Sequence, residues 1–175
     1  MSDTFTLGDM GEALVRYGLE KVYKDVRTVP KNIDDQLVWG DLVVPGAVAM
    51  GLKKIKVEVK TERVHTGNVF WEQWSNRATG REGWGKTSPA DELFYLFWGE
   101  GIGYRFPRFQ NLMWLVDYYQ HDFPLVEQKK YEQGNDSWGR LIPITWFQES
   151  NDVISFDFNG LREEMPDTKN PASED

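Results

Sequence analysis

The sequence predicts a mixed α/β fold in which a mixed β-sheet is flanked by helices. Segments with the 3.6-residue period of a helix alternate along the chain with short apolar runs of strand length. Hydrophobic residues make up 40% of the 175 residues, which is enough for one folded core. We therefore expect a single domain over residues 1–160, followed by a disordered acidic tail over residues 161–175.

The first half of the chain contains one predicted helix and three predicted strands. Residues 6–23 have apolar side chains at helical spacing on two faces. Residues 36–44 (QLVWGDLVV) are apolar enough for a central strand, and residues 55–60 (IKVEVK) alternate apolar and charged side chains with the period of a strand. A third strand is expected over residues 68–74.

The second half alternates in a similar way. A polar loop with several glycines is expected over residues 75–87, and Ser88-Pro89-Ala90-Asp91 resembles the capped start of a short helix. A longer helix is expected over residues 108–120, where apolar residues repeat at helical spacing. The remaining predicted elements are strands over residues 93–98, 139–147 and 153–158.

The net charge of −8 argues against a protein that binds polyanions with its whole surface. The charge is unevenly distributed, because residues 52–87 contain eight basic and four acidic side chains and also hold three tryptophans. Basic groups interleaved with aromatic rings can contact phosphates and stack on bases, although such residues also occur on ordinary solvated faces. The candidate nucleic-acid-binding residues in this region are Lys54, Lys56, Arg63, Arg77, Arg81 and Lys86.

Composition also limits the possible chemistry. The chain has no cysteine and only two histidines, which excludes disulfides, thiolate zinc sites and multi-histidine metal sites within one chain. A bound metal would depend on carboxylates, as Mg²⁺ or Mn²⁺ does. No apolar run reaches the roughly 20 residues of a membrane helix, and MSDTFTLGDM lacks the pattern of a signal peptide, so we expect a cytoplasmic protein without membrane partners.

One motif predicts a nucleotide-binding protein. GREGWGKT, from Gly80 to Thr87, satisfies the pattern GxxxxGK[ST], and LMWLVD ending at Asp117 resembles an acidic strand that helps to hold magnesium. A phosphate-binding loop of this kind requires a buried strand before the first glycine and a helix that begins at the Lys-Thr pair. Here the polar SNRAT precedes the glycine, and Pro89 follows Thr87 closely.

A second motif is the acid-x-Lys sequence Glu58-Val59-Lys60. Of three such sequences in the chain, it alone lies on an alternating strand, where residues i and i+2 project from one face. Asp41 interrupts the apolar segment 36–44, and burying an isolated carboxylate there would be unfavourable. A divalent cation, an ion pair with Lys60 or a position at a strand end facing water would each explain it.

The residues of the second motif resemble the PD-(D/E)xK nuclease superfamily, and the resemblance covers most of the chain. It depends on Asp41, on VEVKTE, and on Glu12 in GEALV of the first helix. The stretch GNVFWEQWSN, then Gly83-Trp84, then ADELFYLF is similar to nuclease-like proteins of phages and bacteria. Gly40 stands where the family name has its proline. The resemblance implies an αβββαβ restriction-endonuclease-like core.

The resemblance also implies a catalytic site formed by Asp41, Glu58, Lys60 and Glu12. Asp41, Glu58 and the backbone carbonyl of Val59 would bind Mg²⁺, for which Mn²⁺ would substitute, and Lys60 would contact the attacking water or the scissile phosphate. Glu12 would bind the metal directly or through water, or would be a helix-surface residue near Arg16.

We therefore expect a magnesium-dependent deoxyribonuclease, an endonuclease rather than an exonuclease, that acts in DNA repair, recombination or degradation. DNA is the expected partner, and a homodimer is one possible assembly because many such nucleases cut two strands as dimers. Two other functions stay open. One is a catalytically idle nucleic-acid-binding or interaction protein with the same fold, and the other is a P-loop NTPase that uses Gly80 to Thr87.

Overall fold

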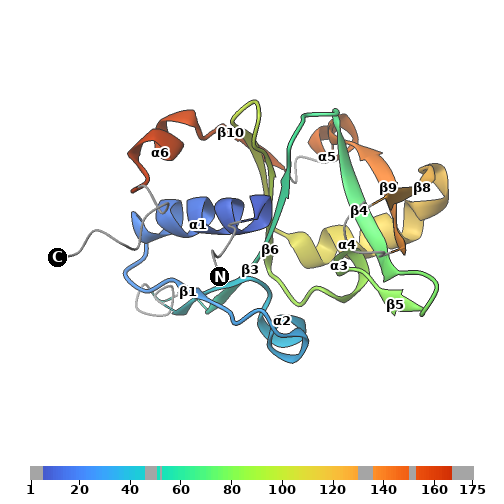
Figure 1. Ribbon diagram of the computed structural model, residues 1–175, viewed down its shortest axis with the longest axis horizontal. Helices are drawn as coiled ribbons and strands as arrows, with labels where there is room; N and C mark the ends of the chain where they lie inside the picture. Colours follow the sequence, from blue (N-terminus) through green and yellow to red (C-terminus); the bar gives the residue numbers. More distant parts are fainter. Residues whose placement is uncertain (1–5, 46–50, 52, 130–135, 150–152, 167–175) are drawn as a thin grey trace.

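The fold combines a six-stranded mixed sheet with a smaller antiparallel sheet (Figure 1). The computed structural model describes residues 6–45, 51, 53–129, 136–149 and 153–166. In the larger sheet the strands β3 and β6 are parallel and all other neighbouring pairs are antiparallel. Its strand order is β1 (Arg27–Thr28), β2 (Leu42–Val44), β3 (Ile55–Glu62), β6 (Glu92–Phe97), β7 (Ile102–Phe106) and β10 (Ile154–Asp157). The predicted mixed sheet flanked by helices is thus confirmed.

The smaller sheet is entirely antiparallel. Its strand order is β5 (Arg81–Glu82), β4 (Asn68–Asn76), β9 (Asp136–Pro143) and β8 (Leu125–Lys129). The predicted third strand, β4, is therefore a member of this second sheet rather than a neighbour of β3, whose two partners are β2 and β6. This arrangement differs from a core in which the three strands predicted for the first half of the chain share one sheet.

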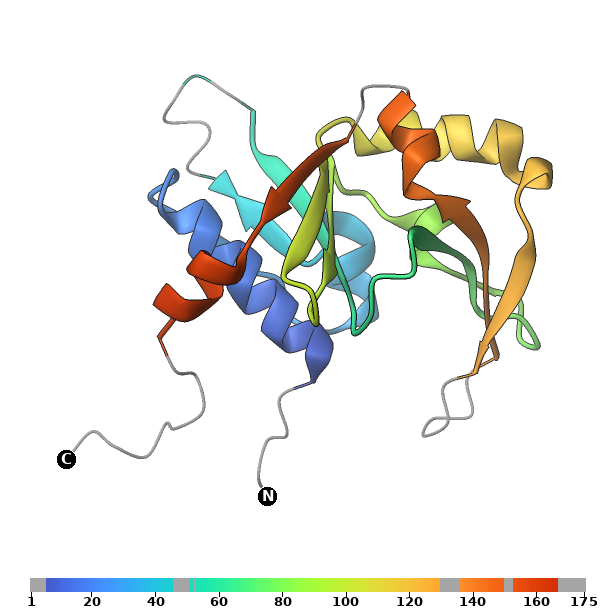
Figure 2. The same cartoon turned by 90° about the horizontal axis from the view of Figure 1, so that it is seen from above.

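α1 (Leu7–Glu20) covers one face of the larger sheet (Figures 1 and 2), whereas α3 (Trp84–Thr87), α4 (Phe109–Tyr119) and α5 (Ile144–Glu149) lie in the segments of chain that run from one sheet to the other. α1 packs on β3 and also contacts α6 (Asn159–Glu164). The other helices are α2 (Ile33–Trp39) and the 3₁₀ turn η2 (Gln120–Asp122). Among the described residues, no helix has the length and apolar character needed to cross a membrane.

Two hydrophobic cores lie on opposite faces of the larger sheet. One contains Leu14 and Val15 of α1 together with Val57 of β3. The other contains Trp71 of β4 and Phe109 of α4. Alternation along β6 supplies apolar side chains to both cores, whereas β3 directs its apolar side chains to the α1 side and its charged side chains to the opposite face.

The predicted strand over residues 36–44 is correct only at its end. Residues 33–39 form α2, whose first turn begins with an Asn32 side chain that accepts a hydrogen bond from the backbone N–H of Asp35. α2 ends at Gly40, which has a φ of 77°. The apolar residues that suggested a strand include Leu37 and Val38, and both are half exposed on the helix surface.

Other boundaries also differ from the sequence-based expectations. The predicted loop 75–87 contains β5 and α3, and residues 88–91 are not helical because Ser88 already has extended backbone angles. β9 ends at Pro143, and the rest of the predicted strand 139–147 belongs to α5. The strands β7 and β8 were not predicted. α6 extends to Glu164, so the predicted disordered tail begins too early, and residues 167–175 lie outside the described residues.

Candidate active site

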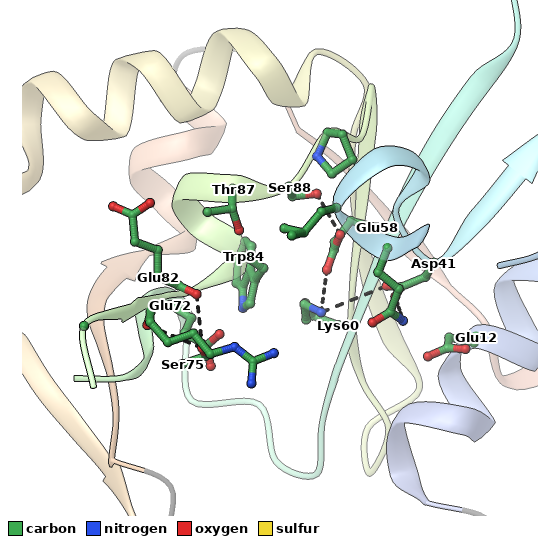
Figure 3. Close-up of a pocket in the computed structure, with 15 residues that line it drawn as sticks. Glu12, Asp41, Glu58, Lys60, Glu72, Ser75, Glu82, Trp84, Thr87 and Ser88 are labelled. Carbon is green, nitrogen blue, oxygen red and sulfur yellow. Dashed lines mark hydrogen bonds and ion pairs between the residues drawn. The ribbon is translucent and has the colours of Figure 1, made fainter. Parts of the chain in front are cut away.

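A cleft of about 620 Å³ opens between α2 on one side and β5 and α3 on the other (Figure 3). Strands β3 and β4 contribute its floor, and α1 contributes one side chain at the edge. The residues that line it are Glu12, Gln36, Leu37, Asp41, Glu58, Lys60, Glu72, Ser75, Gly80, Arg81, Glu82, Trp84, Thr87, Ser88 and Pro89. The cleft therefore contains all four predicted catalytic residues.

Asp41 lies at the junction between α2 and β2 and is buried, with 6% of its surface exposed. Its backbone N–H donates to the carbonyl of Val57 over 2.9 Å, which extends the pairing of β2 with β3 by one residue. Its Oδ2 accepts the backbone N–H of Val59 over 2.7 Å, and its Oδ1 accepts Nε2 of Gln36 over 3.3 Å. The carboxylate is thus fixed between α2 and β3.

Glu58 is equally buried and projects from β3 into the same cleft. Its Oε2 accepts a hydrogen bond of 2.7 Å from the hydroxyl of Ser88, which follows α3. Its Oε1 lies 2.5 Å from Nζ of Lys60. The close contact with Lys60 follows from the alternation of β3, which directs residues i and i+2 to one face.

Lys60 connects the two carboxylates. Its Nζ lies 4.0 Å from Oδ2 of Asp41 in addition to the 2.5 Å contact with Glu58, as the dashed lines of Figure 3 indicate. The Lys60 side chain is 30% exposed, and its Nζ lies 5.7 Å from the centre of the Trp84 ring. Asp41, Glu58 and Lys60 thus converge as predicted, and Asp41 and Lys60 form the ion pair that the sequence offered as an alternative to a bound cation.

Burial dominates the electrostatics of Asp41. Desolvation raises the pKa of Asp41 from its ordinary value of 3.8 to about 7, against the opposing effect of the Lys60 charge. Burial also raises the pKa of Glu12. For Lys60, burial lowers the pKa, but the neighbouring carboxylates Glu58 and Asp41 outweigh this effect and raise it above its ordinary value. The lysine is therefore a stable cation, and the acids beside it favour the binding of positive charge.

The donor atoms around Asp41 and Glu58 fit a hard cation such as Mg²⁺. Magnesium is commonly bound by one or two carboxylates and keeps several waters. The N–H of Val59 points to Asp41, and its carbonyl lies on the same edge of β3, because both groups of one strand residue point the same way. Among the described residues, no three acidic or histidine side chains converge as a metal-binding group. A cation at this site would therefore be bound by the carboxylates of Asp41 and Glu58, the carbonyl of Val59, water molecules and the bound substrate.

The three further acids of the cleft, Glu12, Glu72 and Glu82, already have partners, and Glu82 pairs with Lys86 over 3.5 Å. Glu12 forms a 3.1 Å ion pair with Lys31, rather than with Arg16. Gly11 positions this helix, since a side chain there would overlap Thr61 of β3. Glu72 of β4 lies across the cleft and accepts a 2.8 Å hydrogen bond from Ser137.

Most of the predicted nucleic-acid-binding cations lie outside the cleft. All six belong to the described part of the chain, and Arg81 alone among them lines the cleft. Nζ of Lys54 and Lys56 lie 4.3 and 5.2 Å from the ring centre of Trp39. The guanidinium of Arg77 lies 4.5 Å from the Trp138 ring. Nζ of Lys86 lies 4.1 Å from the Trp74 ring and 3.5 Å from Glu82. Arg63 is an exposed residue at the end of β3.

The segment from Gly80 to Thr87 differs from a phosphate-binding loop. Gly80 precedes the short strand β5, which pairs antiparallel with β4, and α3 is a helix of four residues. The side chain of Thr87 donates to the carbonyl of Gly83. Asp117, the other half of the motif, lies on α4 rather than on a strand. The geometry therefore lacks the long helix that would direct several N–H groups at a phosphate.

Sequence analysis did not identify Gln36 and Ser88 as partners of the two central carboxylates. The sequence pattern places Gln36 in a predicted strand and Ser88 at a predicted helix cap. No local pattern indicates their roles, because each reaches its partner through the tertiary structure.

Comparison of the chain with protein-family models, curated proteins and solved structures finds no match. The geometry of the cleft therefore carries the functional argument.

Proposed function

We propose that the protein is a magnesium-dependent nuclease that hydrolyses phosphodiester bonds in DNA, with endonucleolytic cleavage as its main activity. The observation that supports this proposal most strongly is the pair of buried carboxylates, Asp41 and Glu58, that flank one lysine in an open cleft. Two carboxylates can hold a metal ion, and a neighbouring ammonium can stabilise the charge that develops on a phosphate during metal-assisted hydrolysis.

Each residue has a specific role in this proposal. Asp41, Glu58 and the Val59 carbonyl would hold the cation, which would stabilise charge on the phosphate and lower the pKa of a bound water. Lys60 donates hydrogen bonds to the attacking water or to a phosphate oxygen. Gln36 and Ser88 orient the carboxylates, and Glu12 lies at the cleft edge where it can hydrogen-bond a metal-bound water.

The Lys60 ammonium supports the metal assignment because it shows where positive charge is favoured. It contacts one oxygen of each carboxylate, so it stands in for a cation between them. A carboxylate offers about four lone-pair sites, so hydrogen bonds from Val59, Gln36 and Ser88 leave each group able to bind a metal. When the cation binds, the ammonium would turn toward the open cleft, where the substrate phosphate lies.

The direct test compares Asp41→Asn and Lys60→Met with wild type on supercoiled plasmid, a branched duplex and circular single-stranded DNA, each with Mg²⁺, Mn²⁺ or EDTA. We expect metal-dependent cleavage by wild type and a loss of at least about a hundredfold in both variants, because each removes a group needed in the transition state. Lys54→Met is the matched control, since Lys54 packs on Trp39 away from the cleft. Equal inactivity of all proteins on every substrate would contradict the proposal.

A second candidate is a nucleic-acid-binding protein without catalytic activity. It is favoured by the ion pairs that already occupy Lys60 and by the position of most predicted cations outside the cleft. This candidate predicts that DNA binding is detectable while no substrate is cleaved with any metal, and that Asp41→Asn leaves binding unchanged.

A further inference from the structure

We infer that the cleft accepts an unpaired nucleotide whose base stacks on Trp84, which would make single-stranded or frayed DNA the preferred substrate. This inference rests on the proposed nuclease function. It assigns to Trp84 a role in substrate selection and names the DNA structure that the same site would recognise.

The first argument is the depth of the site. Asp41 and Glu58 are each only 6% exposed and lie on the cleft floor, behind α2 on one side and α3 on the other. A scissile phosphate must reach this floor to contact the cation and Lys60. The cleft, at about 620 Å³, has the size of a small-molecule site, in the range of about 300–1,000 Å³. A strand that is free to leave the base stack can enter it at a lower energetic cost than a paired strand.

The second argument is the placement of Trp84. Its ring is partly buried against the core, where the centre of the Trp71 ring lies 5.2 Å away. The ring also lies 5.7 Å from Nζ of Lys60 and lines the cleft, as Figure 3 shows. A base on this ring would therefore be next to a phosphate held by Lys60. Stacking on an aromatic side chain is tolerant of sequence because every base has a π-face.

The local sequence holds Trp84 in this position. Gly83 and Gly85 flank it, and a Cβ at either residue would lie 2.5 Å from side-chain atoms of β4, on Glu72 and Trp71 respectively. The Trp71 indole N–H also donates to the carbonyl of Gly85 over 3.0 Å. These contacts fix α3 directly against β4 and make the ring a rigid surface.

Apolar and cationic groups complete the proposed subsite. Leu37 of α2 is 51% exposed and lines the opposite wall of the cleft, where it offers an apolar surface to a bound base. Arg81, on the same side as Trp84, can contact the next phosphate of the strand. In this subsite Trp84 and Leu37 would contact one base, and Lys60 and Arg81 would contact two successive backbone phosphates.

The test uses sequence-matched oligonucleotides, one single-stranded, one blunt duplex and one forked, with a single abasic nucleotide moved along the single strand. With Mg²⁺ we expect wild type to cleave the single strand and the fork at least about tenfold faster than the blunt duplex. Cleavage at the phosphate beside the abasic nucleotide should fall roughly tenfold, because that nucleotide cannot stack. This measurement needs no variant and so does not depend on the folding of one.

Variants then assign the effect to Trp84. Trp84→Phe keeps a stacking ring and should stay within about threefold of wild type, whereas Trp84→Leu should lose the single-strand preference and respond no further to the abasic nucleotide. Trp114→Leu, at a tryptophan that is 69% exposed on α4, is the matched control.

Equal cleavage of single strand and duplex, or an abasic effect that persists in Trp84→Leu, would overturn this inference while leaving the nuclease proposal intact. Absence of cleavage on every substrate would instead contradict the nuclease proposal.

Discussion

The pKa of Asp41 connects burial of this single residue to the pH dependence of stability. Its pKa is about 7 in the folded protein and 3.8 ordinarily, so the folded state holds a proton that the unfolded state has lost between these values. The contribution to stability is therefore fully present below about pH 4 and is lost as pH rises through 7. Above that pH the carboxylate is charged in both states.

We accordingly predict that the metal-free wild type loses stability relative to Asp41→Asn between pH 4 and 7. The free energy of unfolding of the wild type minus that of Asp41→Asn should fall as pH rises, by at most on the order of 1.4 kcal/mol per pH unit, since one proton is involved. Urea unfolding in EDTA at several pH values measures it. A difference between the two proteins that stays constant with pH would show that the Asp41 pKa is not raised.

Ser88 provides a second test at the residue scale, because its hydroxyl donates a hydrogen bond of 2.7 Å to Glu58. Loss of a group that orients a metal ligand typically lowers metal affinity about 10- to 100-fold. We predict a weakening of this size for Mn²⁺ binding to Ser88→Ala, measured by calorimetry. Ser75→Ala is the control, since Ser75 lines the same cleft but donates to β5 carbonyls. Equal effects in both variants would exclude a specific role for Ser88.

At this scale the sequence predicted which charged side chains converge but not the residues that hold them in place. Alternation along β3 was sufficient to place Glu58 and Lys60 side by side, because the period of a strand dictates it. Asp41 was recognisable as an isolated acid in an apolar segment. Gln36 and Ser88 were not, since their contacts depend on the packing of α2 and of the segment after α3 on the sheet.

Among the elements, the junction of α2 and β2 determines where Asp41 lies. Gly40 has φ 77° and ψ −153°, a conformation that is essentially restricted to glycine, and a Cβ there would lie 2.8 Å from the carbonyl oxygen of Val57. The glycine thus allows the chain to leave the helix and pair with β3 within one residue.

We predict that Gly40→Ala lowers the free energy of unfolding by about 2 kcal/mol or more and weakens Mn²⁺ binding, because backbone strain and the clash with β3 add. Gly67→Ala is the matched control, with φ 76° and no atom within 4 Å of the added Cβ, and should be destabilised only by backbone strain. Denaturant unfolding compares the two. Equal losses of stability would show that close approach to Val57 is unimportant.

The length and regularity of the sequence pattern explain which helices and strands could be predicted. α1, β3, β6 and α4 have long, regular patterns and form as expected. The α2 segment was misassigned because a short apolar run fits a helix or a strand, and its exposed apolar residues face the cleft and solvent. Membership of β4 in a second sheet depends on its pairing with β9, a contact between segments far apart in sequence.

For the whole molecule, the distribution of charge constrains DNA binding. The net charge is −8, and among the described residues five carboxylates and two cations line the cleft. DNA would be repelled from such a cleft unless divalent cations neutralise it. The basic character of residues 52–87 does not offset this, since four of its eight cations (Lys54, Lys56, Arg77 and Lys86) lie against tryptophan rings outside the cleft.

We therefore predict that DNA binding requires a divalent cation. Fluorescence anisotropy with a labelled single strand should show at least about tenfold tighter binding with Ca²⁺ than with EDTA. Arg81→Ala should weaken the Ca²⁺-dependent binding severalfold, while Arg63→Ala, outside the cleft, should have a small effect. Binding that is as tight in EDTA as in Ca²⁺ would place the DNA on another surface.

Binding of a divalent cation by Asp41 and Glu58 can be seen in a crystal soaked with Mn²⁺, because anomalous scattering locates the manganese ion. We predict a manganese ion about 2.0–2.3 Å from an oxygen of each carboxylate, with the Lys60 ammonium displaced toward the open cleft. A crystal in which manganese binds elsewhere, or in which Lys60 still bridges the two acids at millimolar Mn²⁺, would contradict it.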